Sequence, residues 1–413
     1  MRRAPIEILH LVYGHYPADT RVKRELRALG ATARRRAVIA VRGKGEAAVE
    51  RLENVVTIRV PGHKSRGGLW SYVVEYGDFV LRCRRLVAAH RAFANVQVVH
   101  VHTLPDFLMW AALPARRRAA RLVFDMHEIM PEFTRAKFPG PLGTLMARLA
   151  RRIERWARRR ADLTVTVNRP IDQLLASRPA TPDEHRIIVH NTADPGDFGH
   201  DVRAGETLPP PLLPAAPLRL VYHGTLTHLY GLDIAVRGVA LANANGLDVQ
   251  LTIIGDGPER RRLQAAAGVT VEPPMTHKQL AARLPQYHAG LVPTRLNEMT
   301  RYSLSTKLLE YVHLGLPVLA ADLPSYRLYF GADTLWFWTA NDPAALATVI
   351  RAFVQSDRAE RARRIAKARQ VLEPLAWPAQ ARALLAAYQD LLTRPGQQPA
   401  RIAATRSAAV PSP

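Results

Sequence analysis

Short apolar runs alternate along the chain with longer stretches in which apolar residues recur every three or four positions. Such alternation predicts buried parallel strands connected by helices, which is α/β architecture. In the first half, the pattern predicts strands over 8–12, 37–41, 55–60, 96–101, 122–125, 163–167 and 187–189. It predicts helices over 20–29, 69–92 and 142–160.

The alternation stops at HDVRAGETLPPPLLPAAP, residues 200–217, a proline-rich stretch without periodicity that is typical of a linker. Beyond it, the pattern predicts strands over 218–222, 249–254, 269–271, 290–292 and 318–321, and helices over 232–243 and 259–266. Two such series indicate two Rossmann-like domains, residues 1–199 and 218–376. We expect a helix over 377–394 to pack back towards the first domain, and 395–413 to be a disordered tail.

The composition fits a folded chain with two cores, since 48% of its 413 residues are hydrophobic and 23% are charged. The single cysteine, Cys83, excludes an internal disulfide and any cysteine-based zinc site. The first apolar run is too short for a signal peptide, and the most apolar later window contains His100, His102 and Asp106. We therefore expect a cytoplasmic protein, either soluble or peripheral at the inner face of the membrane.

The net charge of +23 has two possible causes: a GC-rich genome, which favours arginine codons, or binding to an anionic partner. The charge alone does not decide between them. More specific information comes from the loops that follow the strands, because ligands of parallel sheets bind at the carboxyl ends of the strands. These loops are HYPADTR, HTLPD and MHEIMPE in the first half, and HGTLTHLYG, GDGPE and PTRLNEMTRYSLSTK in the second.

The last loop leads into STKLLEYVHLGLPVLA, which is typical of a helix followed by a buried strand. Ser305 or Thr306 is a suitable N-cap, and the amides of the first turn form an anion site to which Lys307 adds its charge. Glu310 lies one turn further on the same side, where its carboxylate suits the hydroxyls of a ribose. These positions fit a nucleoside diphosphate; the alternative is an ordinary surface ion pair between Lys307 and Glu310.

With this helix, the sequence resembles the retaining glycosyltransferases of family 4, which have the GT-B fold. The other motifs that carry the resemblance follow in the family's order: HYPADTRVKRE, VVHVHTLPD, LVFDMHEIMPE, ADLTVTVNRPI, VHNTAD, LVYHGTLTHLYGLDIAV and LTIIGDGPERRRL. The resemblance implies transfer of a sugar from a UDP- or GDP-linked donor to a glycan, lipid-linked or small-molecule acceptor, with retention of anomeric configuration. No Asp-x-Asp pair follows a strand, so we expect cations and helix amides, rather than a metal, to stabilise the leaving group.

Three positions depart from the family's pattern. Tyr302 stands where the first of two glutamates usually contacts the sugar, and Thr225 and Tyr230 stand where Arg and Lys usually hold the diphosphate. The missing positive charge is expected from one of three cations: Lys307, Arg301 or Arg295.

The candidate site residues fall into three groups. The resemblance places His127 beside the reacting sugar, and the expected catalytic residues are His127, Lys307 and Glu310. The expected donor-binding residues are Gly224, Thr225, Gly255, Ser305, Thr306, Lys307 and Glu310. The acceptor-side candidates are His15, Asp19, Arg21 and His102, although Asp19 also suits an ordinary helix cap. We expect His100 and His102 to face opposite sides of their strand, with His102 towards the cleft.

Residues 142–160, LGTLMARLARRIERWARRR, have apolar side chains at helical spacing and arginines on the opposite face. We expect a domain helix that buries the apolar stripe; the alternative is docking on an anionic membrane, which would suit a lipid-linked acceptor. The function expected is glycosyl transfer in polysaccharide or glycoconjugate biosynthesis. The alternatives are a GT-B sugar-nucleotide epimerase and a non-catalytic protein that binds a membrane or a partner. Nucleic-acid binding is not expected, because no recognisable module supports it.

Overall fold

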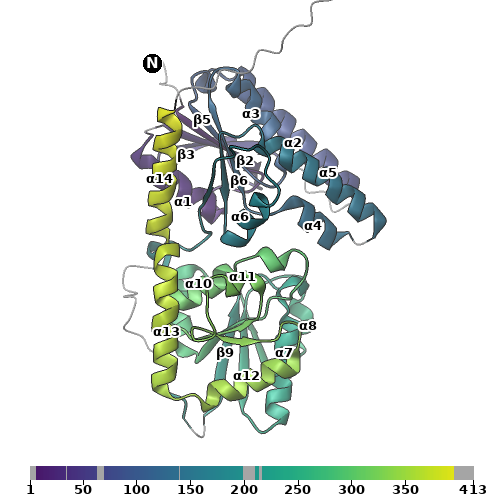
Figure 1. Cartoon of the computed structure of the whole chain (residues 1–413), viewed down its shortest axis with the longest axis vertical. Coiled ribbons are helices and arrows are strands. Elements are labelled where there is room, and N and C mark those ends of the chain that lie inside the picture. The colour runs from purple at the N-terminus through teal and green to yellow at the C-terminus, as the bar shows by residue number, and fades with distance from the viewer. Residues whose placement is uncertain are drawn as a thin grey trace, which may run out of the picture.

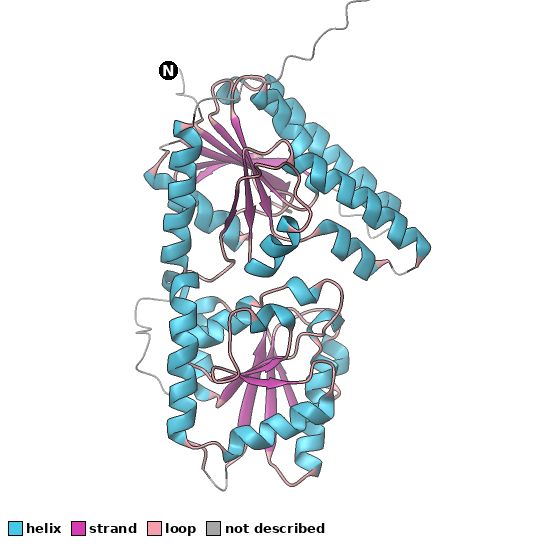
Figure 2. Cartoon of the chain, in the orientation of Figure 1, coloured by secondary structure: helices cyan, strands magenta, loops and turns pink. Residues whose placement is uncertain are grey.

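The computed structural model of the chain describes residues 6–33, 35–62, 69–138, 140–198, 210–213 and 216–394. Two α/β domains stand one above the other (Figure 1), and each has a central sheet flanked by helices (Figure 2). The expected fold class, two Rossmann-like domains with predominantly parallel sheets, is confirmed.

The first domain has an eight-stranded sheet with the order β3-β4-β2-β1-β5-β6-β7-β8. Neighbouring strands are parallel except at the edge, where β3 pairs antiparallel with β4. The strands are β1 (Ile8–Leu11), β2 (Arg36–Arg42), β3 (Val49–Leu52), β4 (Val55–Pro61), β5 (Val98–His102), β6 (Arg121–Met126), β7 (Leu163–Thr166) and β8 (Arg186–Ile188). The helices are α1 (Thr20–Ala28), α2 (Leu69–Ala89), α3 (Met109–Arg116), α4 (Met130–Lys137), α5 (Pro141–Arg158) and α6 (Arg169–Ala176).

The second domain has a six-stranded parallel sheet with the order β11-β10-β9-β12-β13-β14. Its strands are β9 (Leu218–His223), β10 (Val249–Ile254), β11 (Val269–Glu272), β12 (Ala289–Val292), β13 (Val318–Ala321) and β14 (Trp336–Trp338). Its helices are α7 (Leu232–Ala244), α8 (Arg260–Gln264), α9 (His277–Arg283), α10 (Thr306–His313), α11 (Pro324–Arg327), α12 (Pro343–Gln355) and α13 (Arg358–Leu372). The strand order reverses between β9 and β12, as it does between β1 and β5. Ligands of such sheets bind outside the carboxyl ends of the strands at these points.

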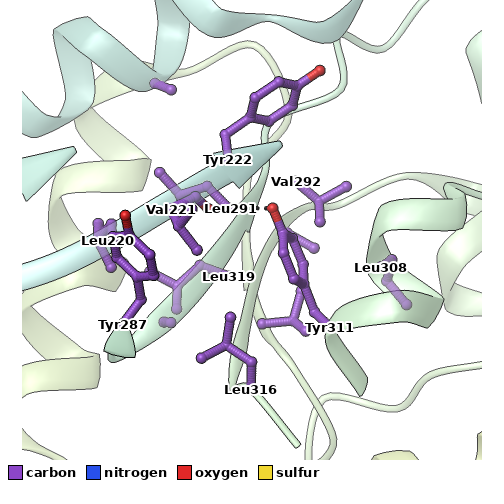
Figure 3. Packing of buried hydrophobic residues seen from close by; sticks show 14 of the residues in the cluster. Leu220, Val221, Tyr222, Tyr287, Leu291, Val292, Leu308, Tyr311, Leu316 and Leu319 are labelled. Carbon is purple, nitrogen blue, oxygen red and sulfur yellow. Dashed lines mark hydrogen bonds between the residues drawn. The ribbon is translucent and has the colours of Figure 1, made fainter. Parts of the chain in front are cut away.

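Apolar packing fixes the position of α10 on the second sheet. Leu308 and Tyr311 of α10 are buried in the core of the second domain, and the Tyr311 ring points towards the sheet (Figure 3). A Cβ atom at Gly290 would lie 2.5 Å from the Tyr311 ring, so the glycine in β12 leaves the room that this ring fills. The Tyr311 hydroxyl accepts a hydrogen bond from the His223 amide at 3.1 Å, which ties α10 to the end of β9.

Helix α14 (Trp377–Thr393) follows the second domain and lies along the first (Figure 1). Its buried residues Trp377, Leu384 and Tyr388 pack in one cluster with Ile8 of β1 and Val98 of β5. The chain therefore ends its described part against the first sheet. Much of the expected linker over 200–217 and all of the expected tail over 395–413 lie outside the described residues.

The sequence pattern did not indicate the edge strands β3 and β14. The residues of β3 alternate between exposed and half-buried, and β14 has only three residues. An edge strand has one neighbour and is commonly short, so it need not contain the continuous apolar run from which buried strands are recognised.

The expectation that α5 buries its apolar stripe holds only in part. Leu142, Leu145 and Leu149 are 65%, 62% and 57% exposed, whereas Met146, Ile153 and Trp156 are half-buried. The helix also buries a face that contains Glu154 and Arg158. Glu154 pairs with Arg158 at 3.2 Å, and carboxylate and carbonyl groups outside the helix accept further hydrogen bonds from Arg158. Among the described residues, no helix has the length and apolarity needed to cross a bilayer.

Candidate active site between the domains

A cavity of about 270 Å³ lies between the two domains. Its first-domain wall is formed by residues that follow β6, β7 and β8, and its second-domain wall by residues that follow β9 and β12 and by the start of α10. The residues that line this cavity include His127, Glu128, Asn168, Tyr230, Tyr302, Ser305, Thr306 and Lys307.

The amino end of α10 opens onto this cavity. Ser305 occupies the N-cap position, but its side chain does not accept a hydrogen bond from the helix amides. Ser305, Thr306 and Lys307 all line the cavity. The first turn therefore presents backbone N–H groups and the positive end of the helix dipole to the cavity, which is the arrangement that binds phosphate groups.

Lys307 adds a full charge to this site. Its ammonium nitrogen lies 4.1 Å from the centroid of the Tyr230 ring and 5.5 Å from that of Tyr222. Such contacts are attractive cation–π interactions, and they hold the side chain at the cavity wall. Burial lowers the pKa of Lys307 to about 8, although the charge of Glu310 acts in the opposite direction.

Gly224 and Gly255 make room for this arrangement. A Cβ atom at Gly224 would lie 2.3 Å from Cε of Lys307, and one at Gly255 would lie 1.9 Å from the carbonyl oxygen of Gly224. Both glycines also have positive φ angles, 123° for Gly224 and 155° for Gly255. Neither residue lines the cavity itself: Gly224 leaves room for the lysine side chain, and Gly255 leaves room for the backbone of Gly224.

Of the three cations proposed from the sequence, Lys307 is the one that lines the cavity. Arg295 donates through Nη2 to both carboxylate oxygens of Asp233, at 2.7 and 2.9 Å, and is thereby engaged outside the cavity. Arg301 is exposed, with its guanidinium 5.7 Å from the centroid of the Tyr302 ring. Thr225 is also exposed and does not line the cavity.

Glu310 lies one turn along α10 from the phosphate site but does not line the main cavity. Its carboxylate is 3.2 Å from Nε2 of His223 and 3.7 Å from Nε2 of His277. Burial alone would raise the pKa of Glu310, but the hydrogen bond with His277 and the charges of His223 and Lys307 hold this pKa below its usual range. Glu310 faces a separate cavity of only about 10 Å³, which is also lined by Phe198.

His127 stands directly after β6 on the opposite wall. Its Nε2 atom lies 3.0 Å from Oδ2 of Asp125, and its backbone amide donates to Oγ1 of Thr103 at 3.0 Å. The imidazole is therefore oriented by a buried carboxylate while its side chain stays 20% exposed. The structure brings His127 and Lys307 to one cavity from two different domains.

The acceptor-side candidates are less accessible than expected. Asp19 caps α1 by accepting a hydrogen bond from the Val22 amide at 3.1 Å. Arg21 is buried and pairs with Asp125 at 2.9 Å, and His102 is fully buried. His15 is half-buried and does not line the cavity.

The expectation that His100 and His102 face opposite sides of their strand is wrong. Their ring centroids lie 4.4 Å apart and the rings are nearly parallel. Side chains alternate along a strand with a period of two, so residues i and i+2 face the same side of the sheet.

Hydrogen bonds between the domains involve residues that the sequence did not reveal. Asn168 donates through Nδ2 to the carbonyl of Tyr302 at 2.9 Å. The Tyr329 hydroxyl accepts from the Arg169 amide at 2.6 Å and lies 2.9 Å from Nε2 of His190. These contacts join residues more than one hundred positions apart, and no local sequence signal reports such a contact.

Comparisons with known proteins bear on both domains. Residues 19–197 match the family model described as Glycosyltransferase Family 4, and residues 217–356 match the model described as Glycosyl transferases group 1. No curated protein matches the sequence significantly.

Solved structures share the whole two-domain fold. Sucrose-phosphate synthase from Thermosynechococcus elongatus has a TM-score of 0.72 and 17% identity, covering 94% of this chain and 99% of that chain. A glycosyltransferase from Rickettsia africae has a TM-score of 0.66 and 13% identity, covering 95% and 100%. HepE from Anabaena in complex with UDP-glucose has a TM-score of 0.65 and 14% identity, covering 93% and 100%.

These likenesses show a shared GT-B fold, and the two family models account for one domain each. The two matches support a glycosyltransferase of the group 1 and family 4 type.

Proposed function

We propose that the chain transfers a sugar from a UDP- or GDP-linked donor to a hydroxyl group of an acceptor, with retention of anomeric configuration. The observation that carries the proposal is that the amino end of α10 and Lys307 share one cavity with His127. HepE, which has the same fold, is known in complex with UDP-glucose, and this supports a nucleotide-sugar as the donor class.

The donor diphosphate lies at the start of α10 in this proposal. The amides of Thr306 and Lys307 and the Lys307 ammonium group stabilise its charge. The same groups stabilise the additional negative charge that develops on the leaving phosphate in the transition state. Fixed N–H groups and a buried cation thus supply the leaving-group stabilisation that other glycosyltransferases obtain from a metal.

The reaction proceeds on the leaving-group face of the sugar. The acceptor oxygen forms a bond to the anomeric carbon as the bond from that carbon to the phosphate oxygen breaks. The acceptor proton moves to the departing phosphate oxygen, so charge and atoms balance without a protein base. His127, oriented by Asp125, contacts the sugar hydroxyls or the phosphate from the first domain.

Glu310 binds the ribose hydroxyls in this proposal, and the structure sets a condition for that contact. The cavity beside Glu310 is smaller than a ribose, and Phe198, which also lines it, packs against His277 and His313. Donor binding therefore requires the segment that contains Phe198 to move. Domain closure over the bound donor would then exclude water, which would otherwise hydrolyse it.

A carboxyl group that the sequence reasoning did not single out, Glu128, also lines the main cavity. Burial raises the pKa of Glu128, while the charge of His127 acts in the opposite direction. The raised pKa disfavours the ionised form that a nucleophilic carboxylate requires. This favours attack by the acceptor over a covalent sugar–enzyme intermediate at Glu128.

The acceptor is a glycan, a small molecule or a lipid-linked substrate, and the exposed stripe of α5 favours the last of these. Leu142, Leu145 and Leu149 are exposed on a helix that also carries many arginines. We infer peripheral contact of residues 142–160 with an anionic membrane at its cytoplasmic face. Flotation with vesicles of anionic lipid tests this contact, and Leu145→Glu should reduce binding, whereas absence of binding at low salt would exclude it.

The proposed activity is tested with a panel of nucleotide-sugars. One of them should be slowly hydrolysed by the enzyme alone, and its nucleoside diphosphate should raise the melting temperature. An epimerase would interconvert sugars without releasing the diphosphate. A purely binding protein would do neither, and either of these outcomes would contradict the proposal.

A further inference from the structure

Three imidazoles and one carboxyl group form a buried cluster inside the first domain. His10 lies on β1, His100 and His102 on β5, and Glu25 on α1, which covers this face of the sheet. All four residues have no solvent exposure. One nitrogen or oxygen atom of each lies within 4.8 Å of the corresponding atoms of the other three.

Strand pairing explains why these side chains meet. β1 and β5 are parallel neighbours, and the register places His10 opposite His100. His102 follows two residues later on the same side of β5. The His10 ring consequently lies 4.5 Å from the His100 ring and 5.0 Å from the His102 ring, measured between centroids.

Several atoms of the cluster have no hydrogen-bond partner among the described residues. They include Nε2 of His100, with Oδ2 of Asp125 3.4 Å away, and Oε2 of Glu25. Oε1 of Glu25 is 3.0 Å from Nε of Arg21, and this ion pair leaves Oε2 as the free carboxylate oxygen. Buried polar atoms of this kind cost stability when they are unpaired, and native structures rarely retain them without a bound ion or water.

The opposite nitrogens of two of these rings have partners that hold the rings in place. Nδ1 of His102 is 3.1 Å from Oδ2 of Asp125, and Nδ1 of His100 is 2.6 Å from the Tyr388 hydroxyl. Metal-binding histidines characteristically make such a bond through the nitrogen that does not contact the ion.

We propose that His10, His100, His102 and Glu25 bind one divalent transition-metal ion. Three imidazoles and a carboxylate suit zinc in tetrahedral geometry. With bonds of about 2.0–2.1 Å, the ligand atoms of such an ion stand about 3.3 Å apart.

The distances between the candidate ligand atoms in the structure are close to the separation expected in a tetrahedral zinc site. Oε2 of Glu25 is 3.8 Å from Nε2 of His100 and 4.0 Å from Nε2 of His102. Nδ1 of His10 is 2.8 Å from Nε2 of His102, and this hydrogen bond is exchanged for metal bonds. Because the His100 and His102 rings are within 11° of parallel, one of them turns when the ion binds.

The proposed ion has a structural role. All four coordination positions are filled by protein, so no position is open to a substrate. The ion joins β1, β5 and α1. Its ligand His102 contacts Asp125 through Nδ1, and Asp125 in turn orients His127. The proposal is independent of the donor site in the second domain and of the proposed function.

Metal analysis of the full chain, prepared without a histidine tag, tests the proposal. After incubation with zinc and dialysis, wild-type protein and a His90→Gln control should each retain about one zinc per chain. His90 is an exposed histidine outside the cluster. His10→Gln and Glu25→Gln should lose at least nine-tenths of this zinc. Wild-type protein that retains no zinc, or folded variants that retain the full amount, would overturn the proposal.

A second measurement covers the case in which the variants do not fold. Wild-type protein loaded with cobalt in place of zinc should show the intense visible absorption of a tetrahedral site. Removal of the metal with a chelator should lower the melting temperature, and zinc should restore it. Weak absorption typical of octahedral cobalt, or a melting temperature that zinc does not change, would overturn the proposal.

Discussion

The ammonium nitrogen of Lys307 lies 4.1 Å from the centroid of the Tyr230 ring. The resemblance to family 4 places Tyr230 at a position where a lysine usually holds the diphosphate. In this chain, the aromatic ring at that position supports a cation that comes from α10 instead. The positive charge of the site is therefore retained, although it is supplied by a different element.

Removing this charge should impair catalysis. Lys307→Ala should lower kcat/KM for the donor by about 10²–10³-fold, the usual effect of losing one group that stabilises a developing negative charge. Lys307→Arg should retain part of the activity, because it keeps the charge in a different shape. Release of nucleoside diphosphate measures both. Full activity of Lys307→Ala would mean that the leaving group is stabilised elsewhere.

Donor affinity should depend on pH through Lys307. Its pKa is lowered to about 8, so the ammonium form that attracts the diphosphate is lost as the pH rises through this value. The Kd for the nucleoside diphosphate should therefore be constant below pH of about 7 and increase above about 8. Calorimetry on Lys307→Arg is the control: its guanidinium stays protonated, so its Kd should not show this increase. An identical pH profile in both proteins would assign the effect to another group.

Gly224→Ala should act through Lys307. The added methyl group would lie 2.3 Å from Cε and 2.9 Å from Nζ of Lys307, displacing the ammonium group from the cavity. We expect weaker diphosphate binding in the same direction as for Lys307→Ala, and little further loss in the double variant. Gly246→Ala is a matched control, since Gly246 also has a positive φ but has no neighbour within 4 Å of the added methyl group. Equal effects of the two alanines would point to backbone strain.

Glu310→Gln should weaken binding of the nucleoside diphosphate by about 10–100-fold, since hydrogen bonds to a charged group contribute about 1.5–3 kcal/mol. The reason is loss of the proposed contact with the ribose hydroxyls. Wild-type protein should bind the 2′-deoxy nucleotide less tightly than the ribonucleotide, whereas the variant should discriminate less. If both proteins show the same preference, Glu310 does not contact this hydroxyl.

Arg158 should be important for stability rather than for catalysis. It is 2% exposed and donates to Glu184 at 2.7 and 2.6 Å. Arg158→Ala would remove the buried guanidinium that pairs with both Glu154 and Glu184, and we expect a loss of about 3–5 kcal/mol in unfolding free energy. Arg155→Ala, at an exposed position of the same helix, should change it by less than about 0.5 kcal/mol. Denaturant unfolding measures both, and similar values for the two would contradict this assignment.

Much of the fold could be predicted because parallel strands are buried on both faces. The runs around β9, β10 and β13 are predominantly apolar, and their boundaries agree with the structure to within one residue. The start of α10 was also evident, because Ser305 precedes it. These are local signals that do not depend on the rest of the chain.

The features that could not be predicted from the sequence depend on contacts between distant segments of the chain. The exposure of Leu145 follows from ion pairs that fix the rotation of α5, and the enclosure of Glu310 follows from His277 and Phe198. The support of Lys307 by Tyr230 likewise joins two loops that are distant in the sequence. Periodicity reports which residues are apolar, but not which neighbour each side chain will meet.

The most direct test of the central claim is a structure of the chain with its nucleoside diphosphate bound. The β-phosphate should accept hydrogen bonds from the Thr306 and Lys307 amides and from the Lys307 ammonium group. Phe198 should have moved, and the ribose hydroxyls should contact the Glu310 carboxylate. A diphosphate bound away from the amino end of α10 would contradict the account.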